Sequence, residues 1–369
     1  RWLGLLLVGG GVAILVVGPR LRSTPPVRPA TSGSAAVVER FQCYRCHDAP
    51  GKLEPAPVEK HCVRCHQAIL AGEFDHDRYD AEDVARWKSH IDLLVEVPSL
   101  LGIDRRFRRN WFVAFLQDPH DLRPNLGASM PRLPIEAADA EAIADHFYGE
   151  ADPSGDAELG DPERGRERFV ALDCGSCHVF SGAGFAGPAG GPAATKAIHL
   201  APDLRHAREQ MSPATVLAWL ADPAAIKPDT SMPKTAMSDA DRRDVAAFVL
   251  RTPLEPAERP VVPSRLPLLD RPVGYAEVED EVFHKICWHC HSDPRPVGGD
   301  GGAGNTGGFG YAGRRIDLGS REAILRGGVA ADGSKIDLVA PRASGAPLLV
   351  EAMMARYAEV AGRREPDLL

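Results

Sequence analysis

CGSCH at residues 174–178 is one of four copies of the pattern Cys-x-x-Cys-His in this chain. The other copies are CYRCH at 43–47, CVRCH at 62–66 and CWHCH at 287–291. Together the four copies use all eight cysteines of the 369-residue chain. Only 13 residues are histidine, so a histidine after each of four cysteine pairs is not a chance arrangement. Two intervening residues let one turn of backbone bring two thiols and an imidazole together.

This pattern is typical of c-type haem attachment, in which two thiols bond to one haem and the following histidine binds the iron. It predicts four covalently bound haem c groups. A zinc site or a redox dithiol would not explain why a histidine follows every cysteine pair. A disulfide framework is typical of much shorter chains. The predicted thioether residues are Cys43, Cys46, Cys62, Cys65, Cys174, Cys177, Cys287 and Cys290, and the predicted proximal ligands are His47, His66, His178 and His291.

The composition is that of an ordinary globular protein, with 25% charged and 44% apolar residues. The formal net charge is −8, and two propionates on each haem would make it more negative. We therefore expect no nucleic-acid binding, and we expect a partner with a basic docking face.

The segment from Trp2 to Gly18 is an unbroken apolar run, at the short end of what spans a bilayer. It predicts a transmembrane anchor (1–18) followed by a Pro- and Arg-rich linker (19–34), although a cleaved signal peptide is the alternative. Arg20 and Arg22 after the run oppose the positive-inside rule. Because haem c is attached outside the cytoplasmic membrane, we expect a membrane-anchored protein with its haem domains on the periplasmic side of a bacterial membrane.

Pro-rich breaks at 149–165 and 251–273 divide the rest into predicted domains at 35–150, with two haems, and at 160–252 and 274–369, with one haem each. The first two domains repeat each other. ERF, VPSL, NWFVAFLQDP, SMPRLP and AEAIADHFY in the first correspond to ERF, APDL, ATVLAWLADP, SMPKT and RRDVAAFVL in the second. The apolar spacing in these segments is helical, and no strand-like alternation is present, so the predicted fold class is all-α.

This order resembles class I cytochrome c, a family with an N-terminal helix, Cys-x-x-Cys-His, a Met-Pro segment that supplies the sixth iron ligand, and a C-terminal helix. The resemblance covers the first two domains. It implies tandem cytochrome c-like haem domains, with Met232 as the distal ligand of the third haem and Met237 as its competitor. It also implies that Met130 is the distal ligand of the first haem. The third domain lacks the Met-Pro segment.

The distal ligands of the second and fourth haems stay open at this stage. The 62–66 motif is interpreted as an insertion, and His90 is ranked before His76 and His61 as its sixth ligand. Met130 on the second haem is the alternative. For the fourth haem the possible ligands are Met353, Met354, His284 and His289. The glycine-rich stretch 298–313 lacks the Gly-Lys-Ser/Thr ending of a phosphate loop, and we interpret it as a loop beside this haem.

Two functions are compatible with these features. The favoured one is a tetrahaem electron-transfer subunit, without catalytic residues of its own, in or beside a quinol-oxidising respiratory or photosynthetic complex. The alternative is a multihaem oxidoreductase such as a peroxidase, with the fourth haem as its catalytic site. The residues show no distal acid–base group over that haem. A photosynthetic tetrahaem subunit of the usual pattern would carry a ligand Met before each motif, which is absent here.

Overall fold

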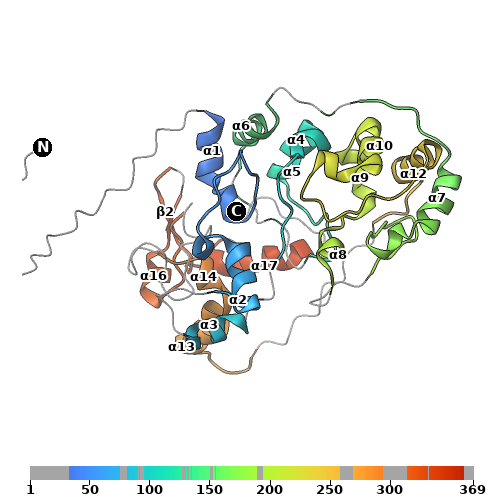
Figure 1. The fold of residues 1–369 in the computed structure, drawn as a ribbon. Coiled ribbons are helices and arrows are strands. Elements are labelled where there is room, and N and C mark those ends of the chain that lie inside the picture. The colour runs from blue at the N-terminus through green and yellow to red at the C-terminus, as the bar shows by residue number, and fades with distance from the viewer. Residues whose placement is uncertain are drawn as a thin grey trace, which may run out of the picture.

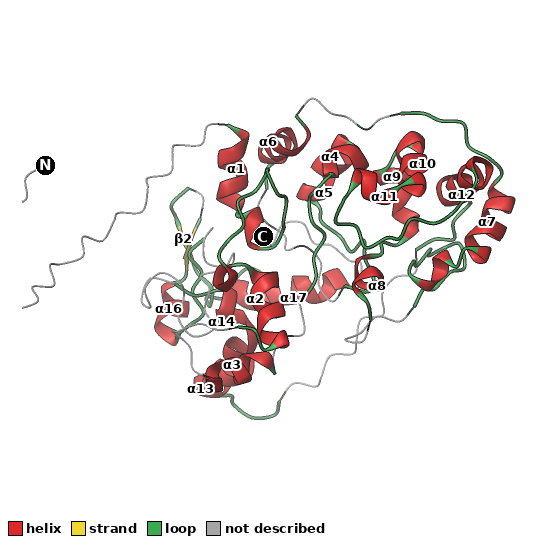
Figure 2. Ribbon diagram, in the orientation of Figure 1, coloured by secondary structure: helices red, strands yellow, loops and turns green. Residues whose placement is uncertain are grey.

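The computed structural model describes residues 33–74, 81–89, 91, 95–126, 130, 133, 135–149, 153, 155–188, 194–257, 269–293, 314–330 and 332–360. These residues are mostly helical (Figures 1 and 2). Three separate hydrophobic cores lie within them, one for each of the three segments that carry cysteine motifs. The predicted anchor, the glycine-rich stretch 298–313, His76 and His90 lie outside the described residues.

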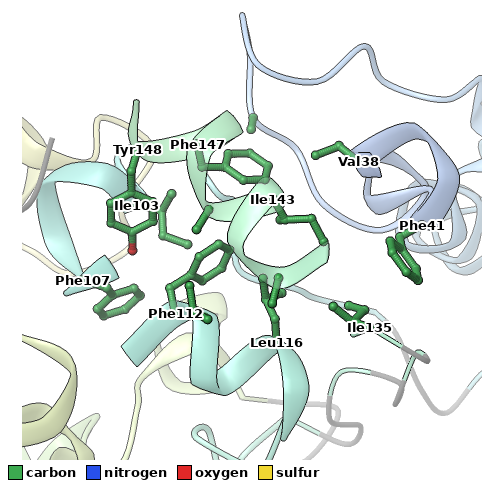
Figure 3. Packing of buried hydrophobic residues seen from close by; sticks show 14 of the residues in the cluster. Val38, Phe41, Ile103, Phe107, Phe112, Leu116, Ile135, Ile143, Phe147 and Tyr148 are labelled. Carbon is green, nitrogen blue, oxygen red and sulfur yellow. The ribbon is translucent and has the colours of Figure 1, made fainter. Parts of the chain in front are cut away.

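The first core is built by α1 (Ser34–Phe41), α5 (Arg109–Gln117) and α6 (Ala137–Tyr148) (Figure 3). Ala140 and Ala144 of α6 are completely buried, and such small side chains let α1 approach closely. The remaining elements of this segment are the 3-10 turns η1 (Cys43–Arg45) and η2 (Val58–Lys60) and the helices α2 (Cys62–Ala71), α3 (Ala81–Lys88) and α4 (Ile103–Arg106).

The second core repeats this plan, with α7 (Pro162–Ala171), α10 (Pro213–Ala221) and α12 (Asp239–Arg251) in the places of α1, α5 and α6. Phe169 of α7 and Phe248 of α12 pack edge to face at its centre. The shorter elements are η3 (Cys174–Ser176), α8 (Lys196–Leu200), η4 (Leu204–His206), α9 (Ala207–Gln210) and α11 (Pro223–Ile226). The repeated sequence segments therefore form the same three-helix arrangement twice.

Gly165 determines how closely α7 and α12 pack. A Cβ atom at this position would lie 2.0 Å from the carbonyl oxygen of Asp244 and 2.8 Å from the side chain of Phe248. Glycine is the only residue without a Cβ atom, so it alone fits this crossing. The Asp244 carboxylate accepts hydrogen bonds from Arg164 and from the backbone of Asp161, which joins the start of α7 to α12.

The third segment contains α13 (Tyr275–Val278), the π-helix η5 (Glu279–Cys287), α14 (Trp288–Cys290), α16 (Arg321–Arg326) and α17 (Leu348–Val360). It also contains the antiparallel pair β1 (Gly328–Val329) and β2 (Lys335–Ile336), which the sequence did not predict. Gly327 allows this pairing, because it has a φ of +76° and a Cβ atom there would lie 2.0 Å from the carbonyl oxygen of Ile336. Apart from this short pair, the helical prediction is confirmed for the described residues.

The predicted membrane-anchored location has to be corrected. Among the residues that the structure describes, no helix is both long enough and apolar enough to cross a bilayer. The run from Trp2 to Gly18, on which that prediction rested, lies outside the described residues.

Replacing Gly165 with Ala tests the close helix crossing. We expect the second core to lose about 1–3 kcal/mol or more of unfolding free energy, because the new side chain overlaps the backbone of α12. Gly175→Ala is the matched control, since its Cβ atom would make only an ordinary contact with Phe185, at 3.5 Å. Denaturant titration followed by circular dichroism measures both variants, and equal midpoints would contradict the crossing.

Candidate functional site

The motifs at 43–47 and 174–178 have the same backbone conformation. Each begins after a residue in the left-handed conformation, Gln42 with a φ of 51° and Asp173 with a φ of 55°. Side chains other than glycine adopt this conformation at a cost, and such residues gather at functional sites. The left-handed residue precedes a 3-10 turn that begins at the first cysteine and ends just before the second. The backbone N–H of each histidine then donates to the carbonyl of the first cysteine, at 3.0 Å in both motifs.

The histidine rings of these two motifs are oriented in the same way. Nδ1 of His47 lies 2.8 Å from the carbonyl oxygen of Pro98, and Nδ1 of His178 lies 3.0 Å from that of Pro202. Since a carbonyl only accepts, Nδ1 carries the proton and Nε2 keeps its lone pair for a metal. Burial lowers the pKa of both imidazoles, which favours the neutral form that binds iron.

The two prolines belong to the repeated segments VPSL and APDL. In both repeats the leucine N–H donates to the residue after the histidine, Leu100 to Asp48 and Leu204 to Val179, at 2.9 Å each. We did not predict Pro98 or Pro202 as part of the sites. The sequence signal that could have identified them is that a proline stands at the same place in both repeated segments.

Met232 lies beside α10, where its Sδ accepts a hydrogen bond from the indole N–H of Trp219 at 2.9 Å. Met237, its competitor, packs against the second core, and its carbonyl accepts from Arg242. The sulfur of Met232 is thus held by a polar contact, whereas Met237 has a packing role. Met130 is half-buried against the first core.

The 62–66 motif has a different conformation, because it forms the first turn and a half of α2. His61 caps this helix, with its Nδ1 accepting from the backbone N–H of Arg64 at 3.3 Å and its Nε2 lying 3.4 Å from Asp48. Nδ1 of this buried histidine therefore has a hydrogen-bond partner, whereas Nε2 has none among the described residues. His61 caps α2 through Nδ1, and its ranking as a possible iron ligand stays a prediction.

The 287–291 motif also lacks the left-handed residue, because η5 continues directly into α14. The carbonyl of His291 accepts from Leu318 at 2.6 Å. Of the possible distal ligands, Met353 is 51% exposed, Met354 is half-buried, and exposed His284 packs edge to face on Trp288.

Three of the motifs meet around Arg45. The thiols of Cys46 and Cys62 hydrogen bond to each other, which raises the pKa of the Cys46 thiol. Cys290 is close enough for its charge to act on Cys46, and Arg45 acts on Cys62 and Cys290. Arg45 itself is buried, and it donates to the carbonyl of Lys60 at 3.1 Å. The structure thus groups the first, second and fourth motifs, which the sequence separates.

Hydrogen bonds connect the surroundings of the third motif to the segment near the first motif. The N–H of Asp203, next to Pro202, donates to the carbonyl of Leu122 at 2.8 Å. Arg123 donates to the carbonyl of Leu200 at 3.0 Å, and its charge contributes to lowering the pKa of His47. The segment around Leu122 therefore lies between the two histidine sites.

A protein-family model described as cytochrome c matches residues 162–253, and no curated protein or solved structure matches the chain. These residues hold the third motif, Met232 and all of the second core. The chain therefore contains a cytochrome c domain, which implies covalently bound haem c and electron transfer by a haem protein.

Buried Arg106 and half-buried Arg123 indicate that the interface between the first and third motifs fits haem. Loss of hydration lowers the pKa of Arg106 to about 10 and that of Arg123 to about 9, so both remain charged at neutral pH. The Nε of Arg106 has no hydrogen-bond partner among the described residues. The anionic propionates of haem are suitable partners for such arginines.

Replacing Arg123 with Met tests this arrangement. A cation near the iron stabilises the reduced form, so we expect the midpoint potential of one haem to fall. Arg251→Met, which removes an exposed arginine at the end of α12, is the control and leaves the potentials unchanged. Potentiometric titration of both proteins makes the comparison, and an unchanged set of potentials in Arg123→Met would place this arginine away from any haem.

Proposed function

We propose that this protein is a tetrahaem c-type cytochrome that relays electrons through four covalently bound haems. The observation that carries the proposal is the spatial grouping of the four motifs. Cys46, Cys62 and Cys290 meet around Arg45, and the third motif joins the first across the Leu122–Asp203 interface. Electron tunnelling weakens steeply with distance, so a relay needs such close spacing.

The order of the relay follows from these contacts. The cytochrome c domain at 162–253 forms one end, the first motif lies in the middle, and the second and fourth motifs form the other end. When bound, each haem iron accepts and returns one electron. The chain holds each ring, supplies the axial ligands and keeps charged groups at fixed places beside them.

The protein sets different potentials along this path. Thioether ligation by Met raises a haem potential relative to a second His. Met232 supplies the thioether at the third haem, and the Trp219 N–H withdraws electron density from its sulfur, which raises the potential further. At the place of Trp219, the first domain has Phe115, which has no N–H to donate. The two Met-ligated haems therefore differ in potential.

Met232→His tests the ligand at the third haem. We expect one midpoint potential to fall and the weak sulfur-to-iron absorption band at the red end of the spectrum to lose part of its intensity. Met237→Leu is the control, because it keeps an apolar side chain in the second core and leaves both properties unchanged. A redox titration recorded with absorption spectra measures them together. Four unchanged potentials in Met232→His would remove Met232 from the iron.

A further inference from the structure

His66 and His289 come from different segments of the chain, yet their rings lie side by side. His66 belongs to α2, and His289 is the second intervening residue of the 287–291 motif, in α14. Their ring centroids are 6.3 Å apart, and the ring planes are inclined by 31°. Both residues are half-buried. Figure 1 shows α2 and α14 as neighbours.

This separation is the one that two imidazoles on opposite sides of a metal ion adopt. An imidazole nitrogen binds a first-row transition metal at about 2 Å, and the ring centre lies roughly 1 Å further out, so the two centroids are about 6 Å apart. The ring planes of such a pair both contain the metal–nitrogen axis, so the angle between them is not restricted. Face-to-face stacking of two rings without a metal would bring them much closer.

Neighbouring residues place both histidine rings close to the cysteines of the second motif. His66 follows Cys62 by four residues on α2, so both lie on the same face of that helix. Cys290, next to His289, lies near Cys62, and Arg45 is close to both Cys62 and His289. The thiols that would hold the second haem are therefore adjacent to the segment that carries His289.

The other described histidines near the second motif are engaged differently. His61 uses Nδ1 to cap α2 and directs Nε2 to Asp48. His284 is exposed, with its Nε2 3.7 Å from Glu279. The backbone of the fourth motif already provides His291 as the residue that follows its second cysteine, so His289 is not needed there as the proximal ligand.

We propose that His66 and His289 are the two axial ligands of the second haem, which is thereby bound between the first and third segments of the chain. The proposal rests on the proposed function, since it requires haem at the 62–66 motif. It assigns His289 to a haem other than the one that its own motif attaches. A haem with two histidine ligands has a lower potential than the Met-ligated ones, so the second haem is a low-potential site in the relay.

The test compares His289→Ala with His146→Ala in the purified four-haem protein. In His289→Ala we expect one haem to change from six-coordinate low spin to high spin in the electron paramagnetic resonance spectrum, and added imidazole to restore the low-spin signal. His146→Ala, on α6 of the first core, is the control and leaves the spectrum unchanged. His289→Met keeps a ligand at this place in case the alanine variant folds poorly, and it raises the midpoint potential of one haem.

A second background identifies the haem concerned. Cys62→Ala combined with Cys65→Ala removes attachment of the second haem, and in that protein His289→Ala should change no remaining haem. Conversion of another haem to high spin there would overturn the proposal, as would unchanged spectra and potentials of His289→Ala and His289→Met in the four-haem protein. Absence of haem c from the second motif of the wild-type chain would instead contradict the proposed function, so the two failures are distinguishable.

Discussion

A hydrogen bond from a histidine Nδ1 to a proline carbonyl fixes the two most sharply defined sites of this protein. The bonds from His47 to Pro98 and from His178 to Pro202 set the tautomer, so that Nε2 is the atom left to bind iron. They also tie each cysteine motif to a loop far along the chain. The loop is held in turn by the leucine N–H two residues after the proline. The helices of each core support the motif and its loop. In the second core, Gly165 allows the close helix crossing on which this support depends.

The four motifs have the same five-residue pattern, but they do not share the same backbone conformation. Two follow a left-handed residue and two run on within helices. The first kind occurs where the chain repeats a three-helix core, and the second kind occurs outside that repeated plan. We interpret the difference as a difference in neighbours, in keeping with the proposal that the second haem takes His289 from another segment.

The sequence predicted the helical fold and the repeat, because these depend on residues close together in the chain. In the sequence, only the resemblance to class I cytochrome c favoured Met232 over Met237 as an iron ligand. The hydrogen bond from the Trp219 N–H to the Met232 sulfur adds a physical reason to prefer Met232. The contacts of His47 with Pro98 and of His66 with His289 could not be read from the sequence, since each joins distant segments. His61 was a possible ligand by proximity, and the structure adds that it caps a helix. The expected membrane location was wrong on the described residues.

The central claim is that all four motifs attach haem covalently, and intact-protein mass spectrometry under denaturing conditions tests it most directly. The account predicts a single species heavier than the polypeptide by four haem groups, with peptides from each of the four motifs carrying one haem after digestion. A mass increase of one haem, confined to the peptide that contains Cys174 and Cys177, would contradict it. The protein would then be a single-haem cytochrome with three other cysteine motifs of different purpose.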